Sequence, residues 1–195
     1  MLNYANTIDR LLFNLRSNIP VWAGMQAGQT VLDVCCGTGA QIRIYSAHGM
    51  LATGVDNNPA MLSLYGNASD PPSLHTADAR CLPFSDNSFD WVSIQFGLHE
   101  KTSTDRCLVI GEMRRVVKLE GFLLFTDYAV PLARNYMGLG IRIIERIAGG
   151  EHYSGFRDFI SKGGLPPLTE KAGLKTIKHR YFARNNVVVI KTSRR

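Results

Sequence analysis

Short apolar runs alternate with longer segments whose apolar residues recur every three or four positions through the first two thirds of the chain. Continuous apolar runs are typical of buried strands, and the longer spacing is typical of helices. Strands that alternate with helices in this way predict βα units and a parallel sheet with right-handed crossovers. The expected strands are residues 30–34, 51–56, 74–78, 89–96 and 122–127, and the expected helices are 4–16, 40–47, 58–64 and 102–117.

Particular residues are expected to start or stop these elements. Pro20 is expected to separate the first helix from the first strand, because proline has no backbone N–H to donate. Asn58 suits the N-cap of a helix, and Pro59 suits its first turn. Glu120-Gly121 is expected to turn the chain into the fifth strand.

Beyond residue 128 the alternation is looser, and glycine and proline pairs divide the chain into short pieces. Two strand-like runs close the sequence, and their short connection is typical of a hairpin. The expected elements are a helix over 137–147 ended by Gly149-Gly150, a loop-rich piece with Tyr153, Phe156 and Phe159, a short helix ending at Ala172, and strands over 174–182 and 187–192.

Composition narrows the class of protein. The 195 residues fit one domain, and 45% of them are hydrophobic, without an apolar run near the ~18 residues that a membrane span needs. The start of the chain lacks the basic and apolar regions of a secretory signal, so a cytoplasmic protein is expected. The four cysteines show no metal-ligand spacing, and no metal is expected. Aromatic residues do not interleave with the charges behind the net +6, so nucleic acid is an unlikely partner, while a homodimer stays possible.

The segment Val31–Gly39 carries the most chemical information. An apolar run ends in Gly37-Thr38-Gly39, and a helix is expected to follow at once. Glycine at both positions lets the backbone turn sharply and approach a ligand where a side chain would collide. In an open α/β sheet, ligands bind beyond the carboxyl ends of the strands, so this turn is expected to lie beside Asp56, which ends the second strand.

Two carboxylates near this turn reduce the number of ligands that it could bind. Asp56 follows the glycines at the distance of a residue that accepts hydrogen bonds from ribose hydroxyls. A nicotinamide dinucleotide is disfavoured, because its fingerprint needs a third glycine where this chain has Ile42. Asp33 would repel a diphosphate, but it would attract the ammonium group of S-adenosylmethionine, which carries adenosine and no phosphate. The residues therefore favour S-adenosylmethionine.

The motifs VLDVCCGTG, GVD and ADARCLPFSDNSFDWV together resemble the class I S-adenosylmethionine-dependent methyltransferases. Within them the chain is most similar to the branch of ubiquinone and menaquinone biosynthesis C-methyltransferases, over roughly residues 28–128. The resemblance implies an α/β fold with a Rossmann-like, seven-stranded, mostly parallel sheet, helices on both faces and an antiparallel last strand. It also implies one methyltransferase domain over 1–195, made of a helical segment (1–28), a cofactor-binding core (29–128), a helical cap or lid (129–172) and a strand pair (173–195).

The same resemblance implies a set of cofactor contacts. Asp33, Cys35, Gly37, Thr38 and Gly39 are expected to hold the methionine part of the cofactor, and Asp56 the ribose. The remaining expected contacts are Asn57 and Met61 beside the adenine, Asp78, Ala79 and Arg80 at its edge, and Gln95 and Phe96 at the methyl-transfer mouth.

The acceptor stays open at this point. The quinone-type enzymes have a Gly-x-Arg-Asn segment after the fourth strand, whereas this chain has Phe96-Gly97-Leu98-His99-Glu100-Lys101. His99 is the candidate base if the acceptor must lose a proton, because imidazole titrates near neutral pH. The leading hypothesis is methyl transfer to a small molecule at carbon, oxygen or nitrogen. The alternatives are an S-adenosylmethionine-binding protein without catalysis, an RNA or protein methyltransferase, and a nicotinamide-dependent reductase.

Overall fold

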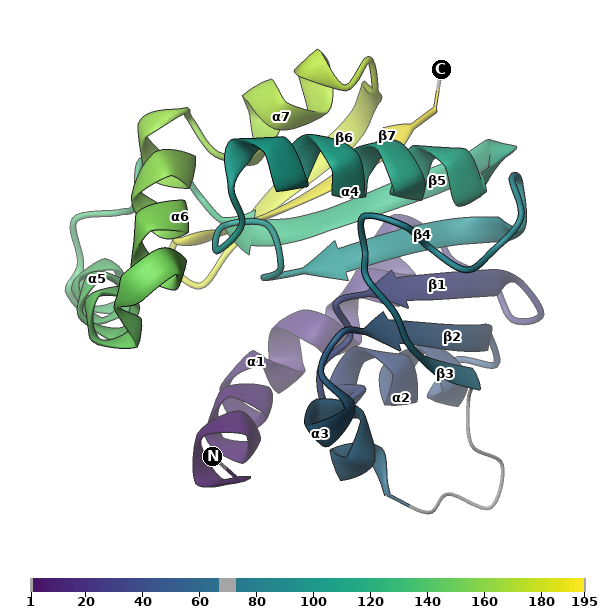
Figure 1. Cartoon of the computed structure of the whole chain (residues 1–195), viewed down its shortest axis with the longest axis horizontal. Coiled ribbons are helices and arrows are strands. Elements are labelled where there is room, and N and C mark those ends of the chain that lie inside the picture. The colour runs from purple at the N-terminus through teal and green to yellow at the C-terminus, as the bar shows by residue number, and fades with distance from the viewer. Residues whose placement is uncertain (1, 67–72, 195) are drawn as a thin grey trace.

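The computed structural model describes residues 2–66 and 73–194, with side chains from residue 12 onward. It contains a seven-stranded sheet in the order β3-β2-β1-β4-β5-β7-β6 (Figure 1). β7 runs antiparallel to both of its neighbours, and every other strand pairing is parallel. The expected mostly parallel sheet with an antiparallel last strand is thereby confirmed. The strands are β1 Thr30–Val34, β2 Leu51–Asp56, β3 Ser73–Thr76, β4 Phe89–Gln95, β5 Val117–Tyr128, β6 Lys175–Phe182 and β7 Val187–Ser193.

Helices cover both faces of the sheet and stand at one end of it. Val109 and Met113 of α4 pack on one face, whereas Ile19 of α1 and Ile42 of α2 pack on the other. Figure 1 shows α5 and α6 at the end towards which the parallel strands point, so these two helices stand over the expected ligand crevice. The helices are α1 Leu2–Ala23, α2 Ala40–Ala47, α3 Pro59–Leu62 with the 3₁₀ turn η1 Ser63–Tyr65, α4 Ser103–Val116, α5 Tyr136–Ala148, α6 Gly150–Ser161 and α7 Leu165–Lys171.

The expected end of the first helix before Pro20 is wrong. α1 continues through Pro20 to Ala23, although proline removes one backbone hydrogen bond and strains the helix. Ile19 and Ala23 are each 1% exposed and pack in the core on the α1–α2 side of the sheet. Burial of these side chains offsets the local penalty, which illustrates how tertiary packing overrides local propensity.

Two further expectations fail for similar reasons. The piece with Phe156 and Phe159, expected to be rich in loop, forms α6, because both rings are buried on one side of that helix. No turn forms at Glu120-Gly121, since β5 begins directly after α4 and runs through both residues. A Cβ atom on Gly121 would lie 2.8 Å from the Asp90 carbonyl oxygen, so this glycine marks a close approach of two strands instead of a turn.

Candidate active site

The glycine turn after β1 is tightly packed. Cys35, Gly37 and Gly39 all have positive φ angles, of 56°, 55° and 73°. A side chain on Gly39 would collide with the ring of Tyr65, whereas one on Gly37 would meet Met61 at 3.6 Å. The turn therefore lies directly against α3 and η1. Glycine is required at position 39 on both conformational and steric grounds.

Asp56 holds the turn in place. Its Oδ2 accepts a hydrogen bond from the Gly37 amide at 2.8 Å, and its Oδ1 accepts one from the Asn58 amide at 2.9 Å. A carboxylate has about four acceptor positions, so each oxygen keeps one for a further donor such as a ribose hydroxyl. The contact with Gly37 was not foreseen from the sequence. The ribose role of Asp56 stays a prediction.

Asp33 lies beneath the turn and is buried against the sheet. Ser93 donates a hydrogen bond to its Oδ1 at 2.6 Å. Burial raises the pKa of Asp33 to about 7, although the bond from Ser93 and the nearby Arg16 oppose that shift. Within the described residues, the side-chain polar atoms of Gln41, Tyr45 and Gln95 are buried without a hydrogen-bond partner.

These unpartnered groups bear on ligand binding, because buried polar groups normally have partners. Burial raises the pKa of the Tyr45 phenol, and the nearby Asp33 carboxylate raises it further, while Ser93, Gln95 and Gln41 neighbour the same hydroxyl. Two amides, a phenol and a carboxylate beside a glycine turn supply both donors and acceptors. This donor set fits the amino-acid end of S-adenosylmethionine.

The residues expected at the adenine edge form a surface ion-pair network. Arg80 contacts Asp78 at 2.6 Å and Asp105 of α4 at 2.9 Å. Hydrogen bonds from Arg80 hold the pKa of the Asp78 carboxyl below its usual range. Arg80 thus ties the turn after β3 to α4, while the neighbouring Ala79 is buried. On the other side of the glycine turn, Asn57 is exposed and Met61 is half-buried.

Aromatic rings gather where β4 and β5 end. Phe96 has a positive φ of 53° and meets Tyr128 edge to face at 5.7 Å between ring centroids. Tyr128 lies 4.7 Å from His99 and 5.8 Å from Phe156, measured the same way. Tyr153 stacks on Phe156 at 6.3 Å, whereas Phe159 is buried in the core. Tyr128, Phe156 and Phe159 therefore surround His99, and Tyr153 joins them through Phe156.

His99 is 4% exposed and lies between two carboxylates. Its Nδ1 is 2.8 Å from Asp127 Oδ1, and its Nε2 is 3.7 Å from Glu145 Oε1. Burial opposes the charged ring, but Asp127 and Glu145 outweigh it and raise the pKa of His99 above its usual value. A raised pKa leaves a smaller fraction of the ring unprotonated at a given pH, so less of His99 is ready to accept a proton.

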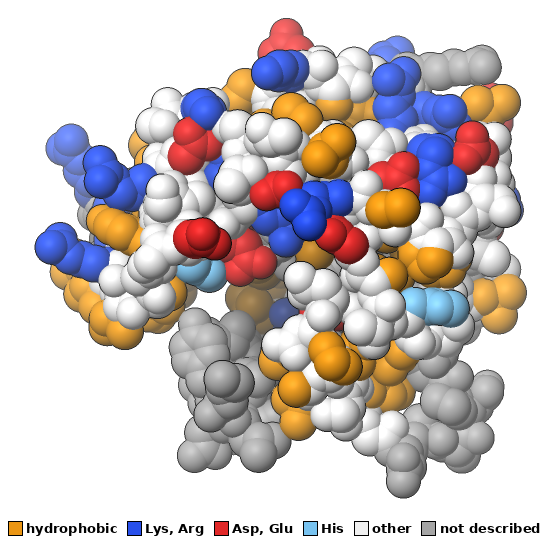
Figure 2. Space-filling model, in the orientation of Figure 1, with side chains coloured by type: hydrophobic (Ala, Val, Ile, Leu, Met, Phe, Trp, Pro, Cys, Tyr) orange, Lys and Arg blue, Asp and Glu red, His pale blue; other side chains and the backbone are white. Residues whose placement is uncertain are grey.

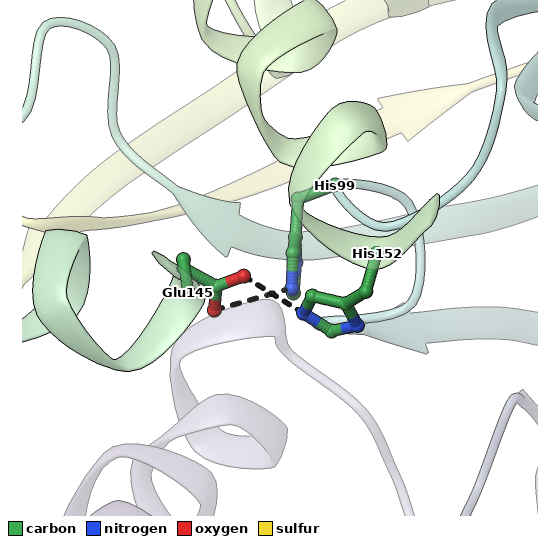
Figure 3. Close-up of side chains that lie close together, drawn as sticks. All are labelled: His99, Glu145 and His152. Carbon is green, nitrogen blue, oxygen red and sulfur yellow. Dashed lines mark hydrogen bonds and ion pairs between the residues drawn. The ribbon is translucent and has the colours of Figure 1, made fainter. Parts of the chain in front are cut away.

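Three further side chains that cluster around His99, namely Asp127, Glu145 and His152, carried little or no signal in the sequence. Glu145 is 3% exposed in the last turn of α5, where an acidic residue looks like part of a solvated helix face. His152 belongs to α6, which was expected to be loop. Asp127 ends the fifth expected strand, which was the one usable signal for it. Figure 3 shows His99, Glu145 and His152 pointing toward one another from three separate elements.

A groove of about 560 Å³ runs between α5 and α6. Apolar side chains make up most of its lining, together with three arginines. Figure 2 shows hydrophobic and basic side chains together over α5. The lining residues are Leu132, Leu139, Arg142, Ile143, Arg146, Tyr153, Phe156, Arg157, Ile160 and Ser161.

Comparisons with known proteins agree with this geometry. A family described as "Methyltransferase domain" matches residues 32–125. A demethylmenaquinone methyltransferase from Staphylococcus haemolyticus is 32% identical over 178 residues, which cover 81% of this chain and 73% of that protein. The solved structure of the PH0226 protein from Pyrococcus horikoshii has a TM-score of 0.71 at 15% identity, covering 94% of this chain and 90% of that one. A putative methyltransferase from Bacillus halodurans has a TM-score of 0.67 at 16% identity, covering 92% and 98%.

Proposed function

Because this chain belongs to the class I S-adenosylmethionine-dependent methyltransferases related to the menaquinone branch, we propose that its acceptor is a quinone-like ring with an apolar tail. The chain is an enzyme that transfers a methyl group from S-adenosylmethionine to a small molecule. The observation that carries the acceptor class is the apolar groove between α5 and α6, which adjoins the aromatic cluster around His99. The similar protein from Staphylococcus is named for demethylmenaquinone, which has this ring-and-tail character.

The cofactor is held, in this proposal, along the carboxyl ends of β1, β2 and β4. Asp56 receives the ribose hydroxyls with the acceptor positions that Gly37 and Asn58 leave open. Asp33 and Gln41 receive the charged methionine end, supported by their burial beside the turn. Gln95 and Phe96 line the mouth through which the methyl group meets its acceptor. The further assigned contacts are Cys35, Thr38, Gly39, Asn57, Met61, Asp78, Ala79 and Arg80.

The sulfonium of the bound cofactor supplies the activated methyl group, so the protein's task is to place the acceptor in line with it. Correct placement alone can lower the activation free energy of such a reaction by about 7–11 kcal/mol. Tyr128, Phe156 and the groove are suited to fix the ring and its tail. The base role of His99 stays a prediction, and Glu145, 3.7 Å from His99 Nε2, is the neighbouring carboxylate that could take up the proton.

The test combines binding with transfer. We expect S-adenosylmethionine to bind the wild-type protein and to bind Asp56→Ala at least tenfold more weakly. Asp86→Ala is the control, since that carboxylate pairs with Arg115 on the surface. Transfer of a labelled methyl group to a demethylated menaquinol should exceed transfer to the same ring without its tail. Equal transfer to both rings, or labelling of RNA or protein instead, would contradict the proposed acceptor.

The setting of the enzyme is a separate proposal. Within the described residues, no helix is long and apolar enough to cross a bilayer. We propose a cytoplasmic enzyme that does not act on nucleic acid, since acidic and basic side chains intermingle on the face shown in Figure 2. A homodimer stays possible, and light scattering on the purified protein tests it directly.

A further inference from the structure

Three side chains that are distant in sequence meet beside the aromatic cluster. His99 follows β4, Glu145 lies in α5 and His152 lies in α6 (Figure 3). One nitrogen of each histidine and a carboxylate oxygen of Glu145 all lie within 4.8 Å of one another. His152 Nε2 is 2.7 Å from Glu145 Oε2, and His99 Nε2 is 3.7 Å from Glu145 Oε1. Two imidazoles and one carboxylate form a common ligand set for transition metals.

The second nitrogen of each histidine also faces a carboxylate. Asp127 lies 2.8 Å from His99 Nδ1, and Glu100 lies 3.1 Å from His152 Nδ1. Histidines that bind metals almost always donate their other ring N–H to such a group, which fixes the ring and its tautomer. Tyr128 similarly donates its hydroxyl to Glu145 Oε1 at 2.8 Å. Each of the three central side chains is thus oriented by a further residue.

Asp127 is itself held firmly. Its Oδ2 accepts hydrogen bonds from the amides of Leu98 and His99, at 3.3 and 3.1 Å, and its Oδ1 accepts one from the Tyr128 amide at 2.8 Å. These three bonds fix the carboxylate at the point where β4 and β5 end. The ring of His99 is therefore oriented by a group that has little freedom to move.

The backbone under the cluster is fixed as well. Arg106 of α4 is fully buried and donates to the carbonyls of Leu98, His99 and Gly155. Gly155 brings α6 against the backbone of Glu100, where a Cβ atom would lie 2.5 Å from the carbonyl carbon. The segment that carries His99 and the helix that carries His152 are therefore joined directly. Preorganisation of this kind is what a metal site requires.

We propose that His99 Nε2, the Glu145 carboxylate and His152 Nε2 bind a divalent first-row transition metal ion such as zinc. Zinc bonds of about 2.0–2.2 Å in a tetrahedral site place ligand atoms about 3.3–3.5 Å apart, so the three ligand atoms, now within 4.8 Å of one another, have to adjust their spacing when the ion binds. Magnesium and calcium ions prefer oxygen ligands, so a site with two imidazole ligands suits them poorly. Three carboxylates lie with two imidazoles here, and a dication would offset most of their negative charge.

Three protein ligands leave a position for water or for an oxygen of a substrate, as in catalytic zinc sites. A metal ion bound to His99 Nε2 occupies the atom that would otherwise accept a proton, so His99 cannot act as a general base while the ion is bound. The inference does not rest on the proposed acceptor. It rests on the cluster alone, and its test needs no methyl transfer. Sequence spacing shows no such motif, because the three ligands come from three separate elements.

The test is metal binding by the purified full chain after treatment with a chelator. Titration calorimetry with Zn²⁺ is expected to show one site per chain in the wild type. Affinity is expected to fall at least tenfold in Glu145→Gln and in His152→Ala, the latter being the safer variant because His152 is half-buried. The matched control is His179→Ala, which removes an exposed imidazole on β6 and should leave affinity unchanged.

A second probe tests whether the exposed thiols of Cys81 and Cys107 bind the metal instead of the three proposed ligands. Co²⁺ absorption should show nitrogen and oxygen ligands without a thiolate band, and alkylating the cysteines should not change it. The proposal is overturned if wild-type protein binds no ion, or if His152→Ala and Glu145→Gln bind as tightly as His179→Ala. S-adenosylmethionine affinity, measured without metal, reports separately on the cofactor site.

Discussion

Replacing Gly155 with alanine should reverse the usual effect of that substitution in a helix. In a helix interior, alanine is favoured over glycine by about 0.5–1 kcal/mol. At Gly155 the new methyl group would meet the carbonyl of Glu100, which is backbone and cannot rotate away. Such overpacking costs about 1–3 kcal/mol, with rigid neighbours at the upper end. We therefore expect a net loss of about 2 kcal/mol in the free energy of unfolding.

Gly111 of α4 is the matched control, because it is exposed and a Cβ atom there has open space within 4 Å. Gly111→Ala should stabilise the protein by about 0.5–1 kcal/mol. Urea unfolding followed by circular dichroism measures both changes as shifts of the midpoint at constant slope. The reasoning is refuted if Gly155→Ala is as stable as the wild type while Gly111→Ala shows its gain. Gly155→Ala should also weaken Zn²⁺ binding, since α6 carries His152.

Three more substitutions test other contacts. Arg106→Met should lower stability by about 1–3 kcal/mol in thermal or urea unfolding, because it removes the hydrogen bonds from the buried guanidinium to the carbonyls of His99 and Gly155 and its ion pair with Asp158; a loss under 1 kcal/mol would argue against this account. Asp33 has a folded pKa of about 7 against an ordinary 3.8, so its ionisation destabilises the fold as pH rises from about 4 to about 7. Asp33→Asn should therefore gain stability over the wild type as pH rises, on the order of 4 kcal/mol by pH 8, since one pKa unit is about 1.4 kcal/mol; parallel pH profiles would contradict this. Asn58→Ala should cost about 1 kcal/mol by removing the cap of α3 and should weaken S-adenosylmethionine binding, whereas unchanged values for both would show the cap to be dispensable.

The sequence predicted the elements around the cofactor site accurately. β1, α2 and β2 begin and end at the expected residues, because each is bounded by glycine or by an aspartate at a strand end. The N-cap of Asn58 on the Ala60 amide is also confirmed. These features depend on neighbours within a few positions, which is the range that a sequence pattern reports.

What the sequence could not supply depends on distant contacts. Pro20 stays inside a helix because residues beside it are buried by the sheet, and Gly121 faces Asp90 across two strands. Glu145 acquires chemical meaning through His99 and His152, which lie on other elements. A pattern along one helix cannot show which partners the fold will bring to it. The acceptor end of the site was therefore the part least visible in the sequence.

The anchoring of α6 by Arg106 has a consequence for engineering new acceptor preferences. Gly155 and Asp158 both bind the buried guanidinium, so substitutions along α6 risk global unfolding before they reshape the groove. α5 presents the exposed Leu139, Ile143 and Ile147. Libraries that randomise those exposed positions should keep most members folded, and selectivity should be easier to redesign from that helix.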